Sequence, residues 1–309
     1  MRTTFINKLT KLAEQDQRIF LVIADLGFSV VEEFERKFPE RFINAGIAEA
    51  NAVSIAAGLA LSGKIPYVYS IAPFVTMRAF EQVRVDCAYM KTNVRLVGVG
   101  GGVSYGPAGA THHAIEDLAI MRALPNMTVL APGDPWEAER LVEQSVDVVG
   151  PVYIRLGKNK EPVVSNPVAC CRIGQANIYC DGSDLSVLTT GNMFETGTRL
   201  VKRLTDDFGM NAALANIHTV KPLDREYLRQ RIQTGRPIIT IEEHNIIGGL
   251  GSAVAEMIAE SGTALAFKRF AIPDEYSHYV GSQEYIRSRW KLDDASLAAE
   301  IVRFVRQTH

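Results

Sequence analysis

Three loops in the first half of the chain carry polar side chains that could take part in chemistry. The first, residues 24–29, places Asp25 and Ser29 on a glycine-containing turn, where a carboxylate and a hydroxyl could contact a polar ligand. The same side chains could instead cap the helix that follows, because Asp and Ser oxygens accept hydrogen bonds from the first amides of a helix. The local pattern leaves both interpretations open.

The second loop, residues 44–52, contains Glu49 in the first turn of an Ala-rich helix expected over residues 48–61. An acid at this place usually interacts with the helix dipole, which contributes about 0.3–1 kcal/mol. The rest of this helix is almost entirely apolar, so we expect it to be buried nearly all round. A buried carboxyl needs a partner or a raised pKa, and such acids are common at active sites. The pattern therefore favours a functional role for Glu49.

The third loop, residues 98–113, is rich in glycine, which allows close approach of the backbone to a ligand, and it ends in His112 and His113. Paired histidines on a loop are often ordinary polar residues. Two of the six histidines of the chain lie in this one segment, however, and this favours a binding or catalytic site. No other His, Cys or acid stands at metal-ligand spacing, so we expect this chain to hold no metal.

These loops need a fold that brings them together. Short apolar runs such as residues 19–23 and 94–99 are typical of buried strands, and they alternate with helix-like segments such as residues 77–90. This alternation predicts an α/β protein with two parallel-sheet, three-layer domains. In such sheets ligands bind beyond the carboxyl ends of the strands, where the three loops would lie. A polar stretch at residues 157–168 is interpreted as a linker between the domains.

Length and composition limit the possible functions. The chain has 309 residues, of which 47% are hydrophobic and 22% charged, enough for two domains with sizeable cores. The net charge of −2 provides no basic excess for nucleic acid or a membrane surface, and no run of 18 apolar residues occurs. The N-terminus lacks a signal-peptide pattern, and the four cysteines include no zinc-type pair. We expect a reduced, cytoplasmic protein.

Six motifs, in this order and spacing, resemble the thiamine diphosphate enzymes of the transketolase family. They are GIAEANA (residues 46–52), MRAFEQVR (77–84), GATHH (109–113), RALPNM (122–127), VKPLD (220–224) and EEHNIIGGLG (242–251). The resemblance covers essentially the whole chain, but only the C-terminal half of a full-length transketolase. It implies a pyrimidine-binding domain over residues 1–165 and the family's C-terminal domain over residues 166–309.

The resemblance implies cofactor contacts at matching positions. Glu49 takes the place of the glutamate that hydrogen-bonds N1′ of the aminopyrimidine and favours the imino tautomer, whose 4′-nitrogen removes the thiazolium C2 proton. Phe74, with Val75 beside it, lies where the family places an aromatic ring against the pyrimidine. Asp25 falls in a loop near the cofactor, and Ile47, in the first motif, is assigned to cofactor binding.

The resemblance also implies substrate contacts. Arg2 and Ser29 match positions that hold the phosphate of a sugar substrate, and Lys158 stands near an arginine with the same task. Arg2 could equally be a solvated terminal charge and Lys158 an ordinary linker residue. His112 matches the histidine that contacts the substrate hydroxyls, and we predict that it is catalytic together with Glu49.

The chain departs from the family pattern in two respects. Gly100 and Ala108 stand where transketolases usually have a histidine and an acid that touch the sugar, so the sugars are not identified. The Gly-Asp-Gly…Asn motif, with which the family holds the diphosphate and Mg²⁺, is also missing. The resemblance therefore implies one subunit of a split enzyme. A separate alpha subunit would carry that motif and the metal, in an α2β2 heterotetramer.

The first hypothesis is thus the C-terminal (beta) subunit of a thiamine diphosphate-dependent split transketolase. It would move a two-carbon ketol unit between phosphosugars, and only in complex with its partner. The alternatives are the beta subunit of a 2-oxo acid or acetoin dehydrogenase and an enzyme like 1-deoxyxylulose phosphate synthase. A third possibility is a non-catalytic subunit that retains the fold.

Overall fold

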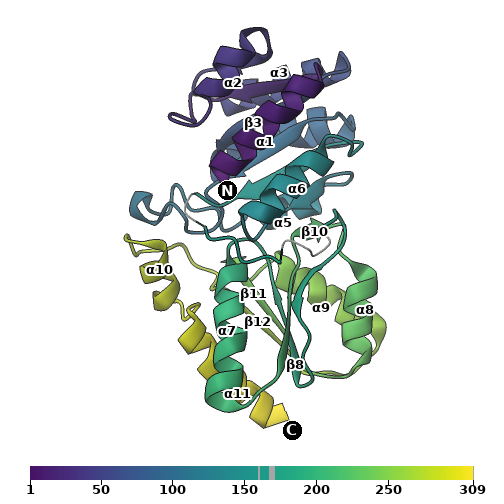
Figure 1. Ribbon diagram of the computed structural model, residues 1–309, viewed down its shortest axis with the longest axis vertical. Coiled ribbons are helices and arrows are strands. Elements are labelled where there is room, and N and C mark those ends of the chain that lie inside the picture. Colours follow the sequence, from purple (N-terminus) through teal and green to yellow (C-terminus); the bar gives the residue numbers. More distant parts are fainter. Residues whose placement is uncertain (159–160, 167–170, 309) are drawn as a thin grey trace.

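The computed structural model describes residues 1–158, 161–166 and 171–308, and these form two α/β units, one above the other in Figure 1. Each has a sheet between two layers of helices, so the predicted fold class is confirmed. The linker predicted at residues 157–168 includes residues 159–160 and 167–168, which lie outside the described residues. The domain boundary between residues 165 and 166 stays a prediction.

Among the described residues, seven strands form the first sheet, in the order β10-β5-β6-β4-β3-β1-β2. They are Ile19–Ile23 (β1), Phe42–Asn44 (β2), Ile65–Ile71 (β3), Arg95–Val99 (β4), Thr128–Leu130 (β5), Val152–Leu156 (β6) and Thr219–Lys221 (β10). β1 to β6 are parallel, whereas β10 runs antiparallel to β5. Since β10 comes from the second half of the chain, the first unit depends in part on the second, which the sequence pattern did not predict.

Neighbouring strand residues of the first sheet point to opposite faces. Leu21 lies in the core that includes α1 (Arg2–Gln15) and α6 (Pro135–Ser145), and Val22 in the core that includes α3 (Glu49–Leu61) and α5 (Asp117–Ala123). The short α2 (Glu32–Lys37) follows the loop after β1.

The helix predicted over residues 77–90 starts earlier, at Phe74, and is not a regular α-helix. It contains the π-helical stretches Phe74–Arg78 and Val83–Tyr89 on either side of α4 (Phe80–Gln82). π-helical turns are rare and frequently lie at functional sites.

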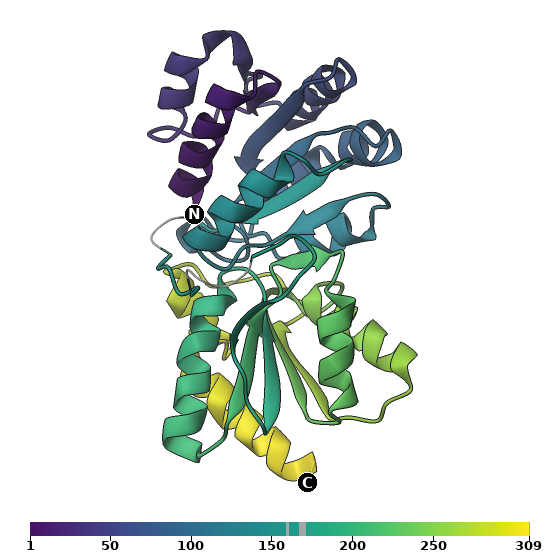
Figure 2. The same ribbon diagram turned by 45° about the vertical axis from the view of Figure 1, so that its right-hand side comes forward.

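In the second unit, five described strands form a sheet in the order β12-β11-β8-β9-β7, with β7 antiparallel to β9. They are Asn177–Cys180 (β7), Leu185–Thr189 (β8), Ala212–Asn216 (β9), Ile238–Asn245 (β11) and Phe267–Ile272 (β12). The helices α7 (Met193–Phe208) and α11 (Asp294–Thr308) cover one face, and α8 (Arg225–Gln233) and α9 (Leu250–Ser261) the other (Figures 1 and 2). The remaining α10 spans Gln283–Arg289.

The N-terminus lies near the junction of the two units, and the C-terminus lies at the far end of the second (Figure 2). The terminal amino group of Met1 pairs with Glu161 at 2.7 Å. This contact holds the first turn of α1, with Arg2, close to the segment that follows β6. No helix in the described part of the chain is both long enough and apolar enough to cross a membrane.

Candidate active site at the carboxyl edge of the first sheet

Glu49 begins α3, and its side chain is 2% exposed. One carboxylate oxygen, Oε2, accepts a hydrogen bond from Arg78 Nη1 at 2.7 Å, and Oε1 accepts one from Ser70 Oγ at 3.1 Å. The partner that a buried carboxyl needs is therefore Arg78, which stands in a quoted motif but was not predicted as a site residue. The Arg78 side chain is 49% exposed, so one side of this ion pair faces solvent.

The prediction that α3 is buried all round is wrong. Ala52 and Val53 pack on the sheet, whereas Asn51 and Ser54 are exposed and Leu61 is 66% exposed. Only one face of the helix meets the sheet, and within the described residues the opposite face is left uncovered. Glu49 lies on the covered side of its first turn, which is why it is buried while the helix as a whole is not.

Phe74 and His112 pack edge to face, with ring centroids 5.2 Å apart. The guanidinium carbon of Arg78 lies 4.6 Å from the centroid of the Phe74 ring, within the range of a cation–π interaction. Glu49, Arg78, Phe74 and His112 thus form one series of contacts, in which Glu49, Arg78 and His112 come from three separate motifs and Phe74 from just before the second. Val75, beside Phe74, is fully buried in the core that includes α3 and α5.

Tyr105 connects His112 to the predicted phosphate-binding residues. The centroids of the Tyr105 and His112 rings are 6.3 Å apart, and Lys158 Nζ lies 4.9 Å from the centroid of the Tyr105 ring. Burial raises the pKa of Tyr105, and the positive charge of nearby Arg2 opposes this rise. Arg2 Nε is buried and has no hydrogen-bond partner in the described part of the chain. Arg2 and Lys158 therefore lie near the same tyrosine.

The position of Tyr105 also accounts for one departure from the family pattern. Gly100 has a φ of +85°, and a Cβ built on it would overlap the Tyr105 ring. The space that a histidine would need at residue 100 is thus taken by the tyrosine. Tyr105 was not predicted as a site residue. Its only sequence signal is that it is the single aromatic residue of the glycine-rich loop besides the two histidines.

Asp25, Ser29 and Ile47 lie on neighbouring loops, after β1 and β2. The Asp25 carboxylate accepts a hydrogen bond from Asn44 Nδ2 at 3.0 Å. Neither Asp25 nor Ser29 caps α2, because this helix begins at Glu32 without a side-chain cap. Asp25 and Ser29 have φ angles of 50° and 61°, which are uncommon for residues other than glycine and often mark functional loops. Ile47 is 77% exposed.

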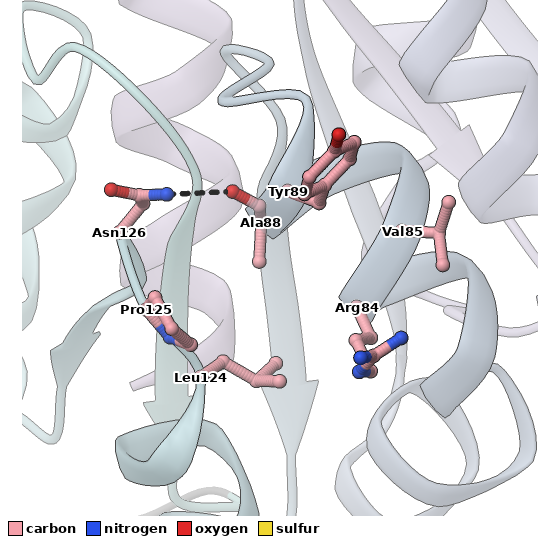
Figure 3. Close-up of a pocket in the computed structure, with 7 residues that line it drawn as sticks. All are labelled: Arg84, Val85, Ala88, Tyr89, Leu124, Pro125 and Asn126. Carbon is pink, nitrogen blue, oxygen red and sulfur yellow. Dashed lines mark hydrogen bonds between the residues drawn. The ribbon is translucent and has the colours of Figure 1, made fainter.

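A cavity of about 370 Å³ lies elsewhere in the first unit (Figure 3). Its lining residues are Arg84, Val85, Ala88, Tyr89, Leu124, Pro125 and Asn126. Asn126 Nδ2 donates to the Ala88 carbonyl at 3.0 Å on one side of it. These segments precede β4 and β5, so the cavity lies at the amino edge of the sheet, opposite the edge with Glu49 and His112.

The comparisons with known proteins identify the family. Residues 1–162 match the family model described as the transketolase pyrimidine-binding domain, and residues 174–295 match that of the transketolase C-terminal domain. The chain belongs to the transketolase family. The resemblance inferred from the motifs is thereby confirmed, for both domains and in the predicted order.

Similar proteins include subunits of transketolases. An apulose-4-phosphate transketolase subunit of Phocaeicola vulgatus is 36% identical over 312 residues, covering 99% of this chain and 97% of that protein. The 6-deoxy-6-sulfo-D-fructose transketolase subunit SqwH of a Clostridium species is 36% identical over 305 residues, covering 98% and 92%. A split-gene transketolase, solved as an inactive β4 tetramer, superposes with a TM-score of 0.91 at 33% identity, covering 100% and 99%. The interpretation of the chain as a transketolase subunit is therefore confirmed.

The side chains at the carboxyl edge fit one part of the family's cofactor. A buried carboxyl beside an aromatic ring, as in Glu49 and Phe74, is suited to a planar aminopyrimidine that offers a ring nitrogen. For a metal ion, the described residues provide no group of three or more His, Cys, Asp or Glu side chains that could hold it.

Proposed function

We propose that this chain is the C-terminal (beta) subunit of a thiamine diphosphate-dependent split transketolase that transfers a two-carbon ketol unit between phosphosugars. The observation that carries this proposal is the series of contacts from Glu49 through Arg78 and Phe74 to His112. It combines a buried acid, an aromatic surface and a histidine at the edge where parallel sheets bind ligands.

The residues have separate tasks in this proposal. Thiamine diphosphate, when bound, supplies the nucleophilic carbon that cleaves and forms the carbon–carbon bond. Glu49 holds a proton at the pyrimidine nitrogen, and Ser70 and Arg78 keep its carboxyl in place. Phe74 packs against the pyrimidine ring. Asp25 and Ile47 contact the cofactor from the loops after β1 and β2.

The substrate would lie over His112 and Tyr105. His112 contacts the sugar hydroxyls and contributes mainly to their binding. Arg2 and Lys158 bind the phosphate, and the unpartnered Nε of Arg2 supports this assignment because it needs an acceptor. Ser29 would contribute its hydroxyl.

The proposal requires a partner. We propose an alpha subunit that carries Gly-Asp-Gly…Asn, holds Mg²⁺ and the diphosphate, and assembles with this chain as α2β2. The uncovered face of α3, which runs from the buried Glu49, supports a contact between subunits at this site. We further propose a cytoplasmic location, which the free thiols of Cys87 and Cys180 support. The domains are proposed to meet between residues 165 and 166.

Co-expression with the candidate alpha subunit tests this function. The purified complex is assayed with thiamine diphosphate, Mg²⁺ and a panel of ketose phosphate donors and aldose phosphate acceptors. We expect ketol transfer by the complex and none by either subunit alone. Condensation of pyruvate with glyceraldehyde phosphate would favour a 1-deoxyxylulose phosphate synthase-like enzyme instead. Acetylation of a lipoyl domain from pyruvate would favour a 2-oxo acid dehydrogenase.

A further inference from the structure

A second buried carboxyl, Glu243 in β11, connects the C-terminal unit to the loop that carries Tyr105 and His112. The Glu243 side chain is 0% exposed. Its Oε1 accepts hydrogen bonds from the Val103 backbone N–H at 2.6 Å and from Gln283 Nε2 at 2.8 Å. Its Oε2 accepts a hydrogen bond from Arg287 Nε and forms an ion pair with the Arg287 guanidinium.

These contacts act at the base of the glycine-rich loop. Gly102 and Ala114 close the loop by exchanging backbone hydrogen bonds of 2.9 and 2.8 Å. A Cβ on Gly102 would overlap the Glu243 carboxylate, so the carboxylate packs directly on the backbone there. Ser104 Oγ accepts further hydrogen bonds from Gln283 at 3.3 Å and from Asn192, which precedes α7, at 3.1 Å.

The far side of the loop is held by the same region of β11. Arg155 in β6 donates from Nη2 to the Ala114 carbonyl at 2.6 Å and to the Glu243 carbonyl at 3.0 Å. Its Nε pairs with the buried Asp117 at 2.8 Å. The side chain of Glu243 thus contacts the first end of the loop base at Val103, and its backbone is linked to the second end, at Ala114, through Arg155.

The geometry points to Glu243, with Gln283 and Arg287, as a positioning residue that fixes loop 100–113 so that Tyr105 and His112 are preorganised for the sugar substrate. A loop with this many glycines is otherwise free to adopt many conformations, and each would misplace the side chains it carries. This inference rests on the proposed function. It also gives the C-terminal domain a task in substrate binding.

Glu242 provides a matched control. It precedes Glu243 in β11 and is also fully buried, but it points to the opposite face. Its carboxylate accepts hydrogen bonds from the Leu250 and Gly251 backbone N–H groups, both at 2.7 Å, at the start of α9. Replacing Glu242 therefore perturbs a buried carboxyl of the same strand without touching the loop.

The test compares Glu243→Gln with Glu242→Gln in the assembled enzyme. We expect Glu243→Gln to raise KM for the sugar phosphates about tenfold, because the loop loses its fixed geometry, with kcat and thiamine diphosphate affinity within a few-fold of wild type. Glu242→Gln should leave all three values unchanged, although both variants lower the melting temperature. Equal KM values for the two variants would overturn the inference. Gln283→Met, a milder change, should move KM in the same direction if Glu243→Gln does not fold.

Amide hydrogen exchange on the chain alone gives a readout that does not depend on activity. Glu243→Gln should speed exchange within residues 100–114, and Glu242→Gln should speed it within residues 249–253. If the complex shows no ketol transfer, the proposed function fails while this measurement still tests the loop. Unchanged exchange at residues 100–114 in Glu243→Gln would contradict the inference whatever the activity.

Discussion

The carboxyl edge of the first sheet and the junction between the two units each contain a buried glutamate paired with an arginine. At the sheet edge, Glu49 has Ser70 and an arginine, Arg78, whose side chain is 49% exposed. At the junction, Glu243 is enclosed by donors from two segments of the chain, the glycine-rich loop and α10, and the side chain of its arginine, Arg287, is 9% exposed.

The difference shows that burial of a carboxyl does not by itself identify a reacting group. Every hydrogen bond of Glu243 comes from buried or half-buried groups of the same chain. If a ligand replaced one of these donors, the donor would be left buried and unpaired, at a large cost in free energy. The Arg78 side chain is half-exposed, so a ligand can approach Glu49 from the solvent side of the ion pair while Arg78 stays paired. A carboxyl with a half-exposed partner, such as Glu49, is suited to bind and release a ligand. A carboxyl whose oxygens are all hydrogen-bonded within the chain, such as Glu243, is suited to hold a loop in place.

The largest effect is expected for Glu49→Ala. Activity of the assembled complex should fall by about 10³-fold or more, because an alanine can neither hold a proton at the cofactor nor accept the Ser70 and Arg78 hydrogen bonds. Steady-state ketol transfer measures this, and size-exclusion chromatography checks that the complex stays assembled. An intact complex with an unchanged rate would make the chain a non-catalytic subunit with a structural Glu49.

Arg78→Met should have the next largest effect. The substitution removes the ion pair with Glu49 and the cation beside Phe74, so kcat/KM should fall about 10- to 100-fold. Arg84→Met is the control, since Arg84 belongs to the same helical segment but lines the cavity at the amino edge. Equal losses in the two variants would show that the segment matters only for folding.

Lys158→Met should change substrate binding rather than turnover. Loss of the charge beside Tyr105 should raise KM for phosphorylated sugars about tenfold at unchanged kcat, and reduce the preference over unphosphorylated analogues. Lys202→Met, on the exposed side of α7, should change neither value. If the Lys158 variant kept the wild-type KM, Lys158 would not bind the substrate phosphate and would be an ordinary linker residue.

The smallest effect is a pH dependence of stability at the junction. Burial raises the pKa of Glu137 to about 8 and that of Glu242 to about 7, so the folded state holds their protons while the unfolded state has lost them. The contribution of the two buried glutamates to the free energy of unfolding is fully present below about pH 4.5, and it is lost as the pH rises to about 7 and 8. Burial lowers the pKa of His218 and of His244 to about 4. These histidines therefore reduce stability as the pH falls below about 6.5, and they do not contribute to the slope above that pH.

The melting temperature should therefore decrease by a few degrees between pH 6.5 and 8. Glu137→Gln should flatten this slope, because Glu137 is the group that still titrates near pH 8. Differential scanning calorimetry across this range measures both proteins. A slope that is the same with and without Glu137 would show that other groups cause it.

Local sequence patterns were sufficient to predict the α/β class, and they also singled out Glu49 and His112, whose roles stay a prediction. Their residue types stand out at strand exits, and the topology brings strand exits together. Arg78 and Tyr105 were missed because their roles depend on contacts between distant segments. Strand β10 was missed for the same reason, since its pairing with β5 joins residues about 90 positions apart.

We propose that Glu49 at the sheet edge takes part in the reaction, whereas Glu243 at the junction only positions the glycine-rich loop. The most direct test is one ketol-transfer assay at saturating substrate, in which complexes with Glu49→Gln and with Glu243→Gln are compared. We predict that Glu49→Gln loses most of kcat, whereas Glu243→Gln keeps kcat within a few-fold of wild type. Retention of kcat by Glu49→Gln, or its loss in Glu243→Gln alone, would contradict the account.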